Sequence, residues 1–354
     1  MISIVTGTIR YDVVIATLNR AKSLENCLSM IENQSERPAR VIIVDASNDH
    51  DQLRTNILAH RDSTIEWIFL RSDVKSSAYQ RNLGLREVKS EVVFLPDDDS
   101  MLHPAAATEM MAGYRADSAG LVAGVSGNQV GVSPLADRST QVQRTRAFKD
   151  RVQPLRNRIE SVLVSEPFKT FPRSLWRDRS IPLWVDGCRF RLVESIGGYQ
   201  LSLRSDLAKE HRFDETLGLG IGYALHEDIE MSIRLQSLGY LLVAAQNAGI
   251  FHDVHPGRRA GGFDYGFCWI INYVYTCRKN FPEESQSWSN DLTKFLLYKL
   301  GLYRMRAIVT RDMYSREVLE GARAAFAARD VLMDAEVSTL PAVYETLCRT
   351  FIRQ

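Results

Sequence analysis

The first 130 residues alternate short apolar runs with segments of helical periodicity. The apolar runs are VVIAT (13–17), VIIVD (41–45), IEWIFL (65–70), VVFL (92–95) and LVAGV (121–125). Their length and β-branched residues are typical of buried strands. After the first run, Leu24, Leu28 and Ile31 recur at helical spacing and place one apolar stripe on a helix. Strands that alternate with such helices predict βαβ units, a largely parallel sheet and the α/β class.

Polar side chains stand at the ends of several predicted strands. Thr17 ends the first run and Asn19 follows it, while Asp45 ends the second run. Three consecutive aspartates, Asp97 to Asp99, follow the fourth run. Ligands of α/β sheets bind outside the carboxyl ends of the strands, so we expect one site there. Because like charges repel and resist burial, the three aspartates need a cation or exposure to water.

The second half of the chain is less regular. Residues 132–182 are rich in arginine and interrupted by proline, which predicts either a solvated connection or arginines that fold over an anionic ligand. In HEDIEMSIRLQSLGY (226–240), Ile229 and Ile233 share a helical face, so His226, Glu227 and Asp228 would occupy the first turn. The last hundred residues have a helical pattern.

Composition and charge exclude several classes of protein. The 354 residues are 45% hydrophobic and 25% charged with a formal net charge of +1, which is ordinary for a globular protein and does not favour nucleic acid as a partner. The five cysteines contain no CxxC, so we expect reduced thiols rather than disulfides or a zinc site. No apolar run spans a bilayer and no signal peptide begins the chain, which predicts a cytoplasmic protein. The P-loop, HExxH and GxSxG motifs are missing from the sequence. A dinucleotide-binding fingerprint directly follows a strand, whereas GLGIGY (218–223) does not, so it is not such a fingerprint.

Five blocks of sequence carry a resemblance to a known family. They are DVVIATLNR (12–20), VIIVDASNDH (41–50), SSAYQRNLGL (76–85), FLPDDDSMLHP (94–104), and RFDE followed by HEDIEMSIRLQSLGY (212–240). In order and spacing they resemble the family-two inverting glycosyltransferases with the GT-A fold. The resemblance implies a catalytic domain over 1–255, with a nucleotide-sugar-binding half at 1–131 and an acceptor-binding and catalytic half at 132–255. A helical C-terminal region at 256–354 would follow.

The resemblance also implies a role for each block. A nucleotide-diphospho-sugar donor, linked to UDP, dTDP or GDP, would contact Thr17, Asn19, Arg20, Asp45, Arg81, Asp97 and Asp98. A divalent metal, Mn²⁺ or Mg²⁺, would bind Asp97 and Asp99 with His252, or with His255 in its place. Pro96 stands where many relatives begin the acidic run, which leaves open which two of the three aspartates bind the metal. Asp228 would be the general base of an inverting displacement, and Glu227 an orienting or acceptor-binding group.

Acceptor and competing functions stay open at this point. Relatives imply a glycan or lipid-linked acceptor, and LTKFLLYKLGLYRMRAIVTR (292–311) either packs on its own domain or contacts a membrane peripherally at its cytoplasmic face. A sugar-1-phosphate nucleotidyltransferase is the first alternative, although ATLNRAKSLENC lacks its glycine-rich phosphate loop. A catalytically silent sugar-nucleotide binding protein is the second. Retention of Asp45, the aspartate run and the Glu227–Asp228 pair argues against it.

Overall fold

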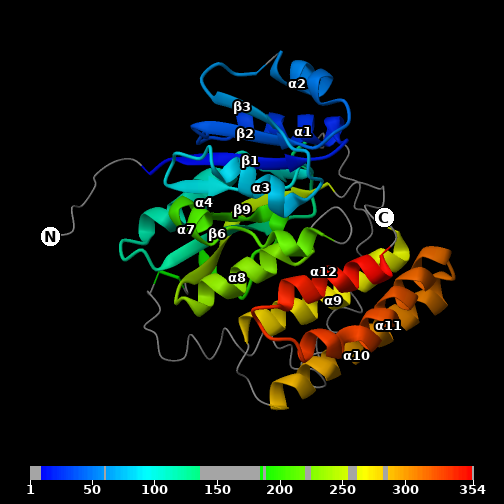
Figure 1. Cartoon of the computed structure of the whole chain (residues 1–354). Helices are drawn as coiled ribbons and strands as arrows, with labels where there is room; N and C mark the ends of the chain where they lie inside the picture. The colour runs from blue at the N-terminus through cyan, green and yellow to red at the C-terminus, as the bar shows by residue number, and fades with distance from the viewer. Residues whose placement is uncertain are drawn as a thin grey trace. The chain divides into compact units, whose positions relative to one another are not determined.

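The structure is a computed structural model that describes residues 9–59, 61–135, 184–185, 189–219, 225–253, 261–281 and 286–352. The chain forms two compact units (Figure 1). The first unit contains the described residues of Met1–Leu135, Ser180–Phe213 and Leu235–Pro256. The second contains those of Ala136–Arg179, Asp214–Arg234 and Gly257–Gln354.

The first unit is built on a mixed sheet. Its strands are β1 (Tyr11–Thr17), β2 (Arg40–Asp45), β3 (Glu66–Arg71), β4 (Val92–Phe94), β5 (Ser100–Leu102), β6 (Val122–Gln129), β7 (Phe190–Leu192), β8 (Ser202–Arg204) and β9 (Leu241–His252). Within the described residues they form one sheet in the order β3-β2-β1-β4-β8-β6-β9-β5, and β7 also pairs with β9. The β3-β2-β1-β4 half is parallel, and β8 joins it antiparallel. The α/β class is confirmed. The parallel pairing predicted from the sequence is found in β3-β2-β1-β4, the half of the sheet that βαβ units build.

Helices of the first unit connect these strands. They are α1 (Ala21–Glu32), α2 (His50–Leu58), α3 (Ser77–Leu85), α4 (Ala106–Ala116) and α7 (Ser205–His211), with a short 3₁₀ turn η2 (Gly198–Gln200). The apolar stripe predicted for the first helix is confirmed, since Leu24, Leu28 and Ile31 of α1 are buried. Helix α3 lies close to the sheet because Gly84 has no side chain; a Cβ there would overlap Val14.

The second unit is helical. It contains η3 (Glu215–Gly218), Glu227–Arg234 of α8 (Glu227–Ser237), α9 (Gly262–Asn280), α10 (Gln286–Thr310), α11 (Met313–Met333) and α12 (Leu340–Phe351). This confirms the helical character predicted for the last hundred residues. Helices α9 and α11 cross closely at Gly321, where a Cβ would collide with the Phe263 carbonyl. No helix in the described ranges is both long and apolar enough to span a bilayer.

One detail of α8 differs from the prediction. The helix begins at Glu227, and His226 precedes it with φ of 70°. A residue in the left-handed region cannot continue a right-handed helix, so His226 lies outside the first turn in which the sequence pattern placed it. Glu227 and Asp228 do lie in that turn.

Candidate functional site

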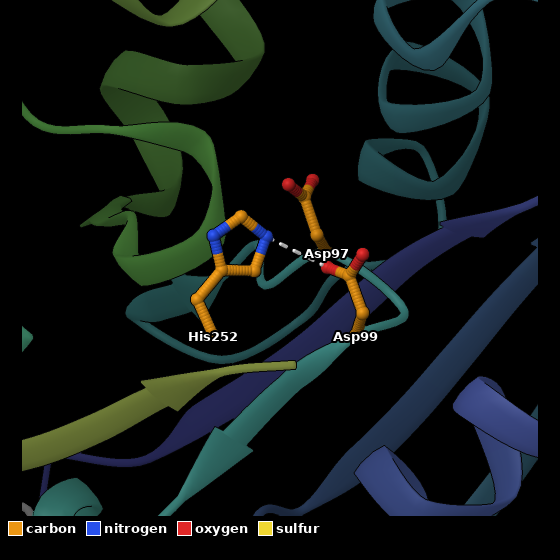
Figure 2. A group of neighbouring side chains, drawn as sticks. All are labelled: Asp97, Asp99 and His252. Atoms are coloured by element: carbon orange, nitrogen blue, oxygen red, sulfur yellow. Dashed lines mark hydrogen bonds and ion pairs between the residues drawn. The ribbon is translucent and has the colours of Figure 1, made fainter. Parts of the chain in front are cut away.

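The Asp97–Asp99 run lies in the loop between β4 and β5, next to the end of β9. Antiparallel pairing of β5 with β9 sets Ser100 opposite His252, and the Asp253 amide donates a hydrogen bond to the Asp99 carbonyl at 2.9 Å. Asp97, Asp99 and His252 each offer one ligand atom, and these atoms lie within 4.8 Å of one another (Figure 2). Sheet topology therefore gathers three donors that are far apart in the sequence.

Two arginines hold the three carboxylates. Arg81 of α3 donates from Nη2 to Asp97 at 2.7 Å, and its side chain is 1% exposed. Arg20 donates from Nη1 to Asp98 and, at 2.9 Å, to Asp99. The Arg81 guanidinium also lies 5.4 Å from the Phe213 ring centroid, a cation–π contact that fixes its plane. These cations compensate much of the charge that made the aspartate run unusual.

Asp98 is not a member of the three-donor group. Its side chain is 4% exposed and accepts a hydrogen bond from Thr17 Oγ1 at 2.8 Å as well as one from Arg20. Burial raises the pKa of Asp98 to about 6, even though the Arg20 charge opposes the shift. Asp97 and Asp99 are thus the two aspartates that lie with His252.

The three-donor group fits a divalent cation. Two carboxylates and one imidazole make a mixed oxygen and nitrogen donor set, which suits Mn²⁺ better than the all-oxygen preference of Mg²⁺. The Asp97 side chain is 25% exposed and that of His252 is 21% exposed, so a ligand could reach both. The Tyr199 ring stacks on His252 with centroids 4.5 Å apart and fixes the imidazole plane. His252 Nε2 lies 3.0 Å from Asp99 Oδ1.

The ends of β1 and β2 form the neighbouring part of the site. Asp45 is fully buried; one of its oxygens accepts from the Ser47 amide at 2.9 Å and the other lies 2.8 Å from His50 Nδ1. A carboxylate has about four acceptor positions, so Asp45 keeps capacity for another donor. Asn19 adopts φ of 54° and its backbone N–H donates to Ser47 Oγ at 2.7 Å, which ties the two loops together.

Some residues of this edge were not found from the sequence. Gln80 donates to the carbonyls of Thr17 and Val44 and so holds β1, β2 and α3 together. His50 stands five residues after Asp45 within a block that was noted, so it could have been proposed as a partner. Tyr199 had no signal, because its contact with His252 depends on the sheet order.

The predicted catalytic pair lies in the second unit. Asp228 is partly exposed, and its Oδ1 accepts from the Ile229 amide at 2.8 Å, while Glu227 is buried. One turn later, Glu230 is fully buried and pairs with Arg234 at 2.8 Å and with Lys279 at 2.9 Å. These ion pairs anchor the turn that carries Asp228, and the sequence had not indicated Glu230.

A charged contact at Asp214, the residue before η3, extends this network. Lys279 also pairs with Asp214 at 2.6 Å. Burial alone would raise the pKa of Asp214, but the Lys279 charge and hydrogen bonds outweigh burial and lower it. His255 and the arginines of 136–182, which the sequence offered as candidates, lie outside the described residues.

The sheet, the acidic loop after β4 and the histidine at the end of β9 define an α/β nucleotide-sugar transferase fold of the GT-A type. Residues 12–195, just over half of the chain, match the model of Glycosyl transferase family 2. The chain belongs to this family and is a glycosyltransferase.

Individual relatives agree with this assignment. Poly(ribitol-phosphate) β-N-acetylglucosaminyltransferase TarP of Staphylococcus aureus is 26% identical over 121 residues, which are 33% of this chain and 37% of TarP. The match thus spans about a third of that relative. S. aureus TarS 1–349 in complex with UDP-GlcNAc covers 97% of this chain and 91% of its own, with 12% identity and a TM-score of 0.54. Mannosyltransferase PcManGT of Pyrobaculum calidifontis, with GDP-Man and Mn²⁺, covers 98% and 83%, with 17% identity and a TM-score of 0.51. Both structures share the fold.

Proposed function

We propose that this glycosyltransferase is metal-dependent and inverting, and that it moves a sugar from a nucleotide-diphospho-sugar to a hydroxyl of a glycan, polysaccharide or glycolipid acceptor. The observation that carries the proposal is the grouping of Asp97, Asp99 and His252 within 4.8 Å. The site lies at the carboxyl edge of the parallel half-sheet, where nucleotide ligands of α/β folds bind.

The neighbours support a nucleotide-sugar donor. Their structures contain UDP, UDP-GlcNAc and GDP-Man with Mn²⁺. In this chain Asp45 would accept from a base N–H, and Thr17, Asn19 and Arg20 would line the donor. The name of TarP, which transfers N-acetylglucosamine to poly(ribitol-phosphate), supports a polymer acceptor.

Each charged residue then has a task in the transfer. Arg81 and Arg20 hold the aspartates in place and supply positive charge near the diphosphate. A bound Mn²⁺ or Mg²⁺ would neutralise charge on the departing nucleoside diphosphate. Asp228 takes the proton from the acceptor hydroxyl as it attacks the anomeric carbon, and Glu227 orients the acceptor. One displacement of this kind inverts the anomeric configuration.

A donor panel with and without metal tests the proposal. The full chain is incubated with UDP-, dTDP- and GDP-sugars and an acceptor extract, in Mn²⁺, in Mg²⁺ or in EDTA, and nucleoside diphosphate release is measured. We expect release with one donor class that EDTA abolishes. Full activity in EDTA would refute the metal role. Pyrophosphate release from a nucleoside triphosphate would identify a nucleotidyltransferase, and binding without turnover a silent binding protein.

The general base needs its own test. We expect Asp228→Asn to lower kcat about 10²-fold to 10⁴-fold with little change in donor affinity, because the amide cannot take the proton. Asp206→Asn is a matched control, since Asp206 also lies in a first helical turn and also accepts a bond from the following amide, at 2.9 Å. Near-normal transfer by Asp228→Asn would show that another group is the base.

We also infer that the C-terminal helices contact a membrane peripherally. Large apolar side chains of α10 are exposed, among them Met305, Ile308 and Val309. A lipid-linked acceptor would be reached in this way.

A further inference from the structure

A groove between the end of α10 and the start of α11 is lined by arginine. It has a volume of about 480 Å³, and its charged residues are Arg304, Arg311, Arg316 and Arg323. Apolar residues, including Ile308 and Leu319, complete the lining, and no carboxylate of the described residues contributes to it. We call this hollow the arginine groove.

The four guanidinium groups have no ion-pair partner among the described residues. Elsewhere in the described residues, arginines such as Arg204 and Arg234 pair with buried carboxylates. Four like charges around one hollow repel one another, so an anion that enters it relieves the repulsion. Guanidinium groups match the geometry of phosphate oxygens.

Arg311 has a further property. It is the first of the two residues that link α10 to α11, and its φ of 55° is a backbone conformation that glycine or asparagine adopts more easily. An arginine therefore occupies a position whose left-handed backbone conformation is unfavourable for it. The resulting placement puts its charge in the groove.

An apolar face of α10 borders the arginine groove. Leu297, Met305, Ile308 and Val309 are 52%, 62%, 63% and 78% exposed and lie within about 120° of one another around the helix. Met313, at the start of α11, is 74% exposed. The α10–α11 end, whose ribbon is drawn in orange in Figure 1, thus combines exposed large apolar side chains with arginines that have no ion pair among the described residues.

We propose that this end docks on an anionic phospholipid bilayer, with lipid phosphates in the arginine groove and the apolar face of α10 in the headgroup region. Arginine beside large apolar side chains is the pattern of interfacial helices. The inference rests on the proposed membrane contact, but it does not depend on the sugar transfer.

Two other occupants fit less well. A soluble polyanion would use the arginines but would leave Met305 and Val309 in water. A second copy of the chain, packed symmetrically on the apolar face of α10, would bring two arginine grooves toward each other, because a two-fold interface repeats the same surface. An anionic bilayer satisfies both the charge and the apolar face.

Vesicle flotation of the full chain tests the proposal. We expect binding to phosphatidylcholine vesicles that contain phosphatidylglycerol, weaker binding in high salt, and no binding to phosphatidylcholine alone. Arg304→Gln combined with Arg323→Gln should weaken binding about 25-fold, because one arginine near an anionic surface contributes about fivefold. Val309→Ser should also weaken it. Arg349→Gln on α12 and Leu238→Ser, both at exposed sites, are matched controls that should bind as the wild type.

The outcomes are separable. Wild-type binding by the double arginine variant, or no binding to anionic vesicles at low salt, would overturn the inference. So would dimers in sedimentation that Val309→Ser dissociates, or retention on soluble polyphosphate without vesicle binding. Nucleoside diphosphate release is measured without vesicles in every variant. If the wild type binds anionic vesicles but releases no nucleoside diphosphate, the transfer proposal is refuted and the membrane proposal stands.

Discussion

The aspartate loop after β4 and the arginine groove of α10 and α11 treat charge in opposite ways. In the loop, each of three neighbouring carboxylates has an arginine partner, and the Arg81 side chain is 1% exposed. In the groove, four arginines have no such partner among the described residues. Paired charges fix a site in advance of its ligand, whereas unpaired charges attract a ligand to a surface. Arginine thus stabilises the aspartate loop by ion pairs, whereas in the arginine groove we expect it to bind an anionic ligand.

Removal of the buried arginine should give the largest change in stability. We expect Arg81→Met to lower the free energy of unfolding by about 3–5 kcal/mol, since it leaves Asp97 without its partner beside two other carboxylates. Urea unfolding followed by circular dichroism measures this. Arg86→Met, at an exposed arginine just after α3, is the control and should change it by less than about 0.5 kcal/mol. Equal losses of unfolding free energy in Arg81→Met and Arg86→Met would contradict the structural role given to the paired arginine.

His226 differs from both groups of arginines, because burial keeps its imidazole ring neutral. Burial and the nearby Lys299 charge lower the pKa of His226 to about 3, and its ring lies edge-on to Trp269 at 5.1 Å. The unfolded chain takes up this proton below about pH 6.5 while the folded chain does not, so stability falls as pH falls. We expect this histidine to account for a loss of about 2 kcal/mol between pH 7 and pH 5.

The variant His226→Asn isolates that effect. Asparagine tolerates the left-handed backbone at this position and carries no titratable proton. Chemical unfolding at the two pH values should show a smaller loss of stability in the variant than in the wild type. Parallel pH profiles for both proteins would contradict the buried, neutral state of His226.

Removal of the Tyr199 ring, which stacks on the candidate metal ligand His252, should have a smaller effect. We expect Tyr199→Ala to weaken Mn²⁺ binding about twofold to tenfold, because an aromatic contact of this kind contributes about 0.5–1.5 kcal/mol to holding the His252 ring. Tyr199→Phe keeps the ring and should bind Mn²⁺ as the wild type does. Calorimetric titration with Mn²⁺ makes the comparison, and equal affinities for all three proteins would remove the proposed support.

The smallest change in stability should come from the groove itself. Arg304→Gln should alter the free energy of unfolding by less than about 0.5 kcal/mol, because the side chain is exposed and has no ion pair with any described residue. The same urea measurement used for Arg81→Met gives the value. A loss comparable to that of Arg81→Met would show that the groove arginines hold the fold.

The sequence predicted the parts of the fold that depend on local patterns. The runs at 13–17, 41–45, 65–70 and 92–95 became the parallel half-sheet, because alternation of β-branched strands with amphipathic helices is readable from the chain. Of the mixed half, the sequence predicted β6, from the run at 121–125, but not its short strands or the strand order. Its strands β7 and β8 are only three residues long, and their pairing with β9 and β4 depends on segments far apart in sequence.

The candidate site divides in the same way. Asp45 and Asp97 to Asp99 could be proposed because they follow strand-like runs, and the family resemblance added His252. The arginine pairing could not be read from the sequence, since Arg20 meets Asp98 and Asp99 only after β1 and β4 are neighbours. The left-handed backbone of His226 was also invisible in the helical pattern around it.

The measurement that tests the central claim most directly is an anomalous-scattering map at the manganese edge, from crystals grown with Mn²⁺ and a nucleoside diphosphate. We predict one manganese peak bonded to Asp97, Asp99 and His252, with Asp98 still bonded to Thr17 and Arg20. A manganese ion coordinated by Asp98, or one bound elsewhere while the nucleotide occupies this edge of the sheet, would contradict the account.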